Sequence, residues 1–174
     1  MKRCQALAEV GRRQFLRGGT VAAASAAAAV VVGGEAQAAT VPNARVSYPT
    51  NRLANLADLK PNEPVEIAYP DADSPGVLIK LGKAVPTGIG PDGDVVGFST
   101  MCPHKGFPLR YSAGDRAFDC PGHYSRFDAE NAGMQIWGQA TQNLAQFELS
   151  VDERGDIYAS GVDELIYGRL SNVL

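Results

Sequence analysis

Two short loops hold both histidines of this chain and two of its three cysteines. One loop reads Cys102-Pro103-His104, and the other reads Cys120-Pro121-Gly122-His123. Fifteen residues separate His104 from Cys120. The third cysteine, Cys4, lies near the N-terminus, far from both loops in the sequence. Each loop therefore offers one thiolate and one imidazole, and any site that uses all four side chains requires the two loops to face each other.

The spacing of these ligands weighs against two common interpretations. A structural zinc site normally pairs like ligands locally, as C-x₂₋₄-C and H-x₃₋₅-H, whereas this chain pairs unlike ligands. A disulfide between Cys102 and Cys120 suits an exported protein, but it leaves both histidines without a role. Both interpretations remain open at the level of sequence.

The C-x-H and C-x-x-H loops, with proline after each cysteine, resemble the cluster-binding loops of Rieske iron–sulfur proteins. In that family two cysteines hold one iron of a 2Fe-2S cluster and two histidines hold the other. The resemblance implies that Cys102 and Cys120 bind one iron and that His104 and His123 bind the second. Such a cluster is neutral when oxidised and carries one negative charge when reduced, so its potential lies at about −150 to +300 mV rather than about −400 mV. The resemblance therefore implies that the protein is a one-electron carrier.

The first 38 residues differ in kind from the rest of the chain. Arg12 and Arg13 precede an uncharged, alanine-rich stretch at residues 18–34 and an Ala36-Gln37-Ala38 site. A basic region, an apolar region and an A-x-A site predict a secretory signal, and Arg-Arg-x-Phe-Leu resembles the bacterial twin-arginine (Tat) signal. We expect residues 1–38 to be this signal peptide, residues 39–174 to be the Rieske domain, and the protein to reach the periplasm. A retained signal anchor and a chance match are the alternatives.

Short β-prone runs separated by turn residues fill the chain after the predicted leader. Four such runs lie at residues 64–69, 76–81, 95–98 and 146–151. The last run leads through a turn at Gly155 into residues 157–159, which predicts a hairpin. The pattern predicts an all-β fold, a Rieske-type antiparallel sandwich or barrel, with a small cluster-binding subdomain within about residues 98–145. Only residues 53–59, over a turn or two, and residues 163–167 favour helix.

Several neighbours of the expected ligands distinguish this chain from other Rieske proteins. Quinol-oxidising Rieske subunits carry a further cysteine in each loop, and the two form a disulfide; Phe107 and Gly122 stand at those positions here. In the same proteins a serine and a tyrosine donate hydrogen bonds to cluster sulfur. Ser125 matches the serine, with a plain turn serine as the alternative, whereas Phe127 replaces the tyrosine. Because such a donor stabilises the reduced state, its loss implies an intermediate potential.

The chain as a whole resembles the small, Rieske-type subunit of bacterial arsenite oxidases. The resemblance rests on the leader and on residues 102–107, 120–128, 138–144 and 161–167. It implies a large partner subunit with molybdopterin and a 3Fe-4S cluster, on which arsenite is oxidised, in a heterodimer or higher assembly. It also implies a periplasmic cytochrome c or azurin-like copper protein as the electron acceptor. The substrate site is then expected on the partner.

Other functions are less well supported by the sequence. The Rieske subunit of a quinol:cytochrome c oxidoreductase needs a lasting membrane anchor and the two extra cysteines. A ferredoxin for a ring-hydroxylating dioxygenase is cytosolic, which the predicted leader disfavours. The net charge of −3 disfavours nucleic-acid binding. We expect Trp137 to be buried on a strand and Lys105 to be solvated, with contact to a partner as the alternative for both.

Overall fold

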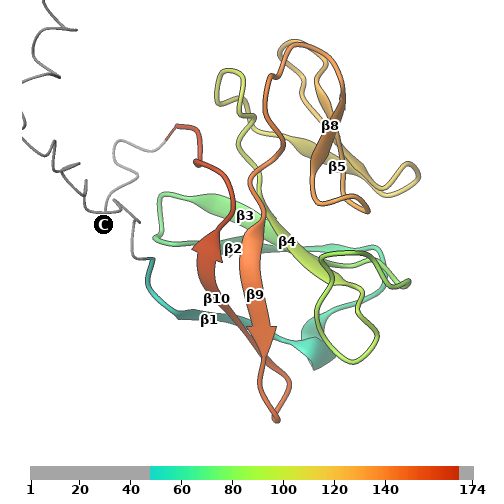
Figure 1. The fold of residues 1–174 in the computed structure, drawn as a ribbon, viewed down its shortest axis with the longest axis vertical. Helices are drawn as coiled ribbons and strands as arrows, with labels where there is room; N and C mark the ends of the chain where they lie inside the picture. The colour runs from blue at the N-terminus through green and yellow to red at the C-terminus, as the bar shows by residue number, and fades with distance from the viewer. Residues whose placement is uncertain (1–47, 169–174) are drawn as a thin grey trace, which may run out of the picture. The chain divides into compact units, whose positions relative to one another are not determined.

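Ten short strands paired into three antiparallel sheets dominate the computed structural model, which describes residues 48–168 (Figure 1). The first sheet contains β1 (Asn51–Asn55), β10 (Asp156–Val162) and β9 (Phe147–Val151), in that order. The second contains β2 (Pro64–Ala68), β3 (Pro75–Lys80) and β4 (Val95–Ser99). The third contains β5 (Arg110–Ser112), β6 (Ala117–Asp119), β7 (Arg126–Asp128) and β8 (Met134–Trp137).

The two three-stranded sheets form what we call the base. Its strands are long enough to bury alternate side chains in a regular way, as Ile157 and Ala159 of β10 do. Strand β3 instead has three consecutive buried side chains, because the sheet is covered on both faces. Leu78 packs into the base with Ile157, whereas Val77 packs on the opposite side, against the third sheet's core. Covering both faces explains why this run is apolar without alternation.

The four-stranded sheet and its loops, at residues 100–145, form what we call the cluster subdomain. The chain enters it after β4 and leaves it at β9, and its four strands are only three or four residues long. Phe118 and Phe127 pair across β6 and β7 and face β4. The rings of Phe118 and Phe98 meet edge to face with centroids 5.4 Å apart. This contact, in a geometry that contributes about 1 kcal/mol beyond burial, attaches the subdomain to the base.

The structure bears out most of the predicted elements and corrects two of them. The predicted strands, the hairpin of β9 and β10, and the all-β class are confirmed. The turn or two of helix expected at residues 53–59 is confirmed only in part: β1 runs to Asn55, whose side chain caps a single 3-10 turn, η1 (Leu56–Asp58).

The helix expected at residues 163–167 is wrong. Asp163 continues the pairing of β10 with the neighbouring strand, because its N–H donates to the Gln146 carbonyl at 3.1 Å and its carboxylate accepts from the Gln146 N–H at 2.6 Å. Ile166 is then fixed in the base core. The predicted leader lies outside the described residues. Within residues 48–168, no helix has the length and apolar character needed to cross a membrane.

Candidate metal centre

The two cysteine loops are closed by the same pair of backbone hydrogen bonds. In the first loop, Gly106 N–H donates to the Cys102 carbonyl at 2.8 Å, and Cys102 N–H donates to the Phe107 carbonyl at 2.9 Å. In the second, Tyr124 N–H donates to the Cys120 carbonyl at 3.1 Å, and Cys120 N–H donates to the Ser125 carbonyl at 2.8 Å. The loops are therefore structural duplicates that hold their cysteines in the same local geometry.

The fourth residue after each cysteine adopts a left-handed conformation, which the closed loop requires. Gly106 has φ of 66° and Tyr124 has φ of 60°. Glycine tolerates this conformation at little cost, whereas tyrosine does not adopt it readily. Sequence reasoning passed over Tyr124, and only a loop-to-loop alignment of the two Cys-Pro motifs would have singled it out.

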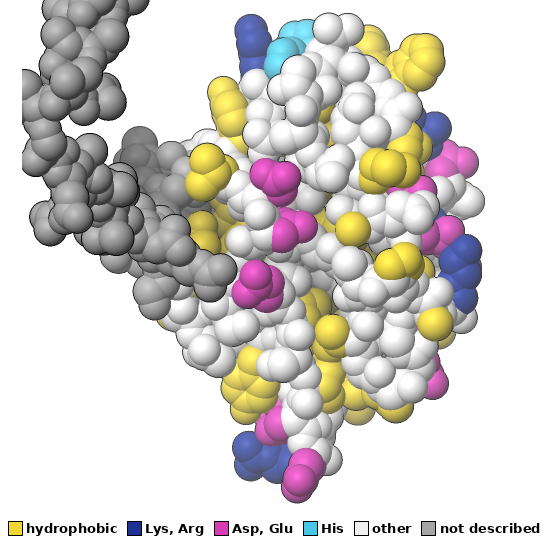
Figure 2. All heavy atoms as spheres, viewed as in Figure 1, with side chains coloured by type: hydrophobic (Ala, Val, Ile, Leu, Met, Phe, Trp, Pro, Cys, Tyr) yellow, Lys and Arg dark blue, Asp and Glu magenta, His cyan; other side chains and the backbone are white. Residues whose placement is uncertain are grey.

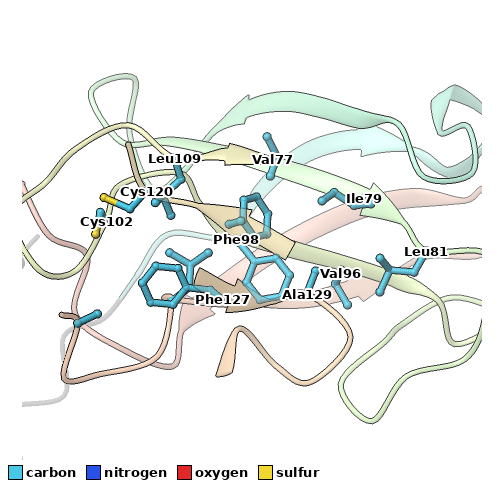
Figure 3. Close-up of a cluster of buried hydrophobic side chains, with 13 residues drawn as sticks. Val77, Ile79, Leu81, Val96, Phe98, Cys102, Leu109, Cys120, Phe127 and Ala129 are labelled. Atoms are coloured by element: carbon cyan, nitrogen blue, oxygen red, sulfur yellow. The ribbon is translucent and has the colours of Figure 1, made fainter. Parts of the chain in front are cut away.

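Both cysteines are free and buried at one end of the cluster subdomain's core. Figure 3 shows the Cys102 and Cys120 side chains together at the edge of the buried group, with their sulfur atoms close to each other. Burial raises the pKa of the Cys102 thiol, and the nearby Cys120 thiol adds to the rise. The backbone N–H groups of His104 and Lys105 donate toward the Cys102 sulfur, and these hydrogen bonds lower the pKa of the thiol. A metal that binds the sulfur would favour the thiolate further.

The two histidine rings lie next to each other, with their centroids 4.7 Å apart and their planes at 77°. The Nδ1 atom of each ring is buried and has no hydrogen-bond partner among the described residues. The rings as a whole are only partly buried, and Figure 2 shows histidine at the surface. Because a buried nitrogen without a partner is costly, each Nδ1 is placed where a metal would satisfy it.

The donor set fits a dinuclear cluster. The described residues contain no group of three or more His, Cys, Asp or Glu side chains arranged to hold one metal ion. A 2Fe-2S cluster does not require such a group, because bridging sulfides complete the coordination of each iron beside two protein ligands. Two protein ligands for each iron are available here: the sulfurs of Cys102 and Cys120 form one pair, and the rings of His104 and His123 form the other. Since the two sulfurs are free, the disulfide interpretation does not describe this structure.

Phe107 and Gly122 bring the two loops into direct contact. A Cβ atom at position 122 would lie 2.8 Å from Phe107 Cδ2, so the ring rests on the glycine backbone. The same ring meets the edge of His123 at a centroid distance of 5.8 Å. The positions aligned with the extra cysteines of quinol-oxidising subunits therefore do face each other. Here an aromatic ring on a glycine makes the contact between the loops.

Ion pairs join the two strands on either side of the second loop. Asp119 at the end of β6 pairs in register with Arg126 at the start of β7. Arg126 Nε donates to the Asp119 carboxylate at 2.6 Å, and its terminal nitrogen donates to Asp115 at 2.8 Å. The hydrogen bond from Arg126 lowers the pKa of Asp115. These bonds fix the spacing of the two strands on either side of the Cys120 loop.

Ser125 links the second loop to a third one at residues 138–144. Its buried hydroxyl oxygen accepts hydrogen bonds from the N–H groups of Gln139 and Ala140, both at 3.0 Å. With both acceptor positions used, the hydroxyl proton remains available for donation. Phe127 is fully buried in the same core group as the two cysteines and carries no donor there. A donor role toward a bound cluster is therefore possible for Ser125 and impossible for Phe127.

Exposed aromatic side chains lie in the second loop and on the strand next to it. Trp137 is 68% exposed and Tyr124 is 74% exposed. The prediction that Trp137 is buried is wrong: Trp137 pairs with Arg126 on β8, an edge strand on which no residue is buried. Lys105 is exposed, as expected. Figure 2 shows exposed hydrophobic side chains on either side of the histidine surface, which is typical of a protein contact site.

Comparisons with known proteins agree with this arrangement. A sequence model of the family described as "Rieske [2Fe-2S] domain" matches residues 50–148. Iodate reductase subunit IdrB of Denitromonas iodatirespirans is 46% identical over 132 residues, which make up 74% of this chain and 70% of that protein. IdrB of Pseudomonas sp. (strain SCT) is 41% identical over 127 residues, 71% of this chain and 66% of that protein. The soluble domain of Rieske protein II from Sulfolobus acidocaldarius has a similar fold, with a TM-score of 0.62 at 22% identity, covering 73% of this chain and 83% of that one.

Proposed function

The chain belongs to the Rieske 2Fe-2S family, and we propose that it is the electron-transfer subunit of an exported molybdenum oxidoreductase that oxidises arsenite. The observation that carries the electron-transfer role is the pair of duplicate loops. Each loop places one buried thiol and one histidine at the same end of the subdomain, and the histidine's Nδ1 has no hydrogen-bond partner in the part of the chain that the structure describes. The fold and family establish a Rieske-type 2Fe-2S cofactor.

We assign Cys102 and Cys120 to one iron and the Nδ1 atoms of His104 and His123 to the other. When bound, the cluster supplies the uptake and release of one electron at a time. The burial of the chain's own residues determines the side from which an electron enters or leaves the site. The cysteines are buried against the core, while the histidine rings are partly exposed, so the short path to another protein leads out through the histidines.

The surface around these histidines suits a protein partner. Phe107, Tyr124 and Trp137 are all exposed, and Phe107 touches His123 directly. Covering these rings with an apolar surface of a partner would remove water from the contact and bring a second redox centre close to the histidines. In our proposal the large molybdenum-containing subunit supplies electrons, and a periplasmic cytochrome c or azurin-like protein removes them.

The choice of arsenite rests on the sequence resemblance of the loops, the third loop and the C-terminal end to arsenite oxidase small subunits. A second candidate, iodate reduction, is favoured by the 46% identity with an iodate reductase subunit. The two reactions send electrons through the chain in opposite directions. Arsenite oxidation delivers electrons to the cluster, whereas iodate reduction withdraws them.

Direction of electron flow separates the two candidates in one preparation. The experiment uses the native complex and follows the reduced cluster by low-temperature electron paramagnetic resonance. Arsenite is added to the oxidised complex, and in a parallel sample iodate is added to the dithionite-reduced complex after the excess reductant is removed. We expect arsenite to produce the reduced signal and iodate to leave it unchanged.

Each other result has a definite meaning. Loss of the signal with iodate, and no signal with arsenite, would replace arsenite oxidation by iodate reduction. A signal that responds to neither compound would retain the electron carrier and reject both substrates. If a quinol, added to a further sample of the oxidised complex, reduced the cluster, this result would instead support the quinol:cytochrome c alternative. Finding the mature chain in the periplasmic fraction, beginning at Ala39, would support the Tat leader.

A further inference from the structure

The last described segment of the chain, at residues 163–168, reaches from the base to the first cysteine loop. Its anchor is Ile166, which is only 2% exposed and packs with Tyr69 and Phe147 in a core group of the base. Asp163, at its start, exchanges two hydrogen bonds with Gln146. The segment is therefore fixed to the base on the N-terminal side of Tyr167.

Tyr167 lies directly against Gly106. A Cβ atom built at position 106 would lie 2.7 Å from both Cδ1 and Cε1 of the Tyr167 ring. Gly106 is the residue whose N–H closes the loop onto the Cys102 carbonyl, and its φ of 66° is set by that closure. The side chain of Met101 lies at the same place, 3.8 Å from that Cβ position and 3.4 Å from the one at Gly168.

The first loop is thus held from two sides. Phe107 presses on Gly122 of the second loop, and Tyr167 presses on Gly106 from the base. On each side an aromatic ring meets a glycine backbone, which permits a closer approach than any side chain would. Both contacts lie one or two residues from His104 or His123 in the chain.

We propose that Tyr167 is a positioning residue for the metal centre: its ring fixes the first loop, and through it His104, relative to the base. The ring performs this role by packing, so its hydroxyl is not required. The effect of Tyr167 on the cluster is transmitted through Gly106 and the closed loop. The proposal does not depend on which substrate the partner subunit uses.

Removing the ring would loosen the first loop and admit water to the face of the loop that the ring covers. Water stabilises the reduced cluster, which carries one more negative charge than the oxidised one, so the reduction potential would rise. The Gly106–Cys102 hydrogen bond would open more often, and the metal would be lost faster. A residue with a purely global structural role would not change the potential and the loop opening together.

The experiment uses the full chain with its cluster and compares Tyr167→Ala, Tyr167→Phe and Leu165→Ala. Leu165 is the matched control, because it lies in the same segment and its side chain is 63% exposed. The measurements are amide hydrogen exchange over residues 102–107, cluster loss in the presence of a chelator, the electron paramagnetic resonance spectrum and the reduction potential. None of them depends on substrate turnover.

We expect Tyr167→Ala to speed exchange and cluster loss several-fold, to shift the spectrum and to raise the potential. Tyr167→Phe and Leu165→Ala should match the unmodified chain. Wild-type behaviour of Tyr167→Ala would overturn the proposal. So would equal effects from Leu165→Ala, which would indicate general loosening, or from Tyr167→Phe, which would assign the role to the hydroxyl.

A second variant tests the same contact without removing the ring, in case Tyr167→Ala does not fold. Gly106→Ala places a methyl group against the Tyr167 ring, and it should perturb the loop in the same measurements. Where Tyr167→Ala does fold, the double variant Gly106→Ala/Tyr167→Ala lacks the clash, and only the backbone strain at position 106 remains. We expect the two changes to be clearly non-additive. Additive effects would mean that the ring and the loop do not act on each other.

Discussion

The base and the cluster subdomain reach a folded state by different means. The base uses strands of five to seven residues and two apolar core groups that run between its sheets. The cluster subdomain uses strands of three or four residues, and its core group ends at two free, buried cysteines. Beside them are two histidines whose Nδ1 atoms have no hydrogen-bond partner within residues 48–168. The base is packed by its own side chains, whereas the cluster subdomain has buried polar atoms that a cofactor would satisfy.

The difference teaches that the base depends on its own side chains for stability, whereas the cluster subdomain also depends on its cofactor. Binding of a metal group to a site that exists only in the folded state contributes to folding free energy. The cluster subdomain therefore gains its stability in part from the cluster that makes it useful. The base supplies a rigid support through β4 and through the segment that carries Tyr167. The following predictions test this division, starting from the largest expected effect.

Replacing a cysteine ligand should break the cluster subdomain and spare the base. We expect Cys102→Ser and Cys120→Ser each to lose nearly all bound iron and acid-labile sulfide, because an iron loses one of its thiolates. Amide exchange should then rise over residues 100–145 and stay slow in β9 and β10. Iron analysis and exchange mass spectrometry provide the readouts, and Met134→Ala, at an exposed position on β8 outside the two loops, is the control. Full cluster content in either variant would refute the ligand assignment.

Joining the two loops covalently should make the cluster subdomain less dependent on its cofactor. The contact of Phe107 with Gly122 indicates that the double variant Phe107→Cys/Gly122→Cys can form a disulfide. A closed loop of about fifteen residues stabilises by up to about 3 kcal/mol in the chain-entropy model. Unfolding of the cluster-free chain, with and without a thiol reductant, measures this gain against the two single variants. Failure of the disulfide to form would show that the loops are less close than described.

Adding a donor inside the core should change the potential without changing the fold. Phe127→Tyr places a hydroxyl in the buried group that contains both cysteines. If it donates to cluster sulfur more strongly in the reduced state, by about 1 kcal/mol, the reduction potential rises by about 40 mV. Phe118→Tyr, on the neighbouring strand, is the control for an added hydroxyl elsewhere in the same core. An unchanged potential in Phe127→Tyr would mean that position 127 does not reach the cluster.

The smallest effect concerns an ion-pair link between the two regions. Glu130 in the cluster subdomain lies 2.7 Å from Lys83, between β3 and β4, and 2.7 Å from Arg116. Hydrogen bonds from Lys83 and then from Arg116 lower the pKa of Glu130 in the folded chain. The link therefore stabilises above the unfolded carboxyl pKa, about 4.3, and this contribution is lost as the pH falls through the lower, folded value.

We expect Glu130→Gln to lower the free energy of unfolding by at most about 1 kcal/mol at pH 7, because the pairs are partly solvated. The difference from the unmodified chain should shrink as the pH falls below about 4. Denaturant unfolding at several pH values measures it, with the exposed Glu153 changed to Gln as the control. A difference that stays constant across this pH range would mean that the charge of Glu130 plays no part.

The sequence by itself determined the chemistry and the broad fold of this protein. Two Cys-Pro loops with one histidine each predict the donor set that we propose, because the choice of metal depends on ligand types that can be read directly from the residues. The strands of the base were also predictable, since runs of five or more residues are long enough to show alternation or an apolar stretch. The strands of the cluster subdomain were not, because three residues carry no period that can be recognised.

Tertiary structure decided the features that depend on residues distant in sequence. Residues 163–167 have a helix-compatible local composition, yet pairing with Gln146 and burial of Ile166 hold them extended enough to bring Tyr167 to Gly106. Trp137 belongs to a strand as expected, but it is exposed because β8 is an edge strand of its sheet, on which no residue is buried. Local propensity amounts to less than about 1 kcal/mol per residue, so packing and pairing across the fold override it wherever the two disagree.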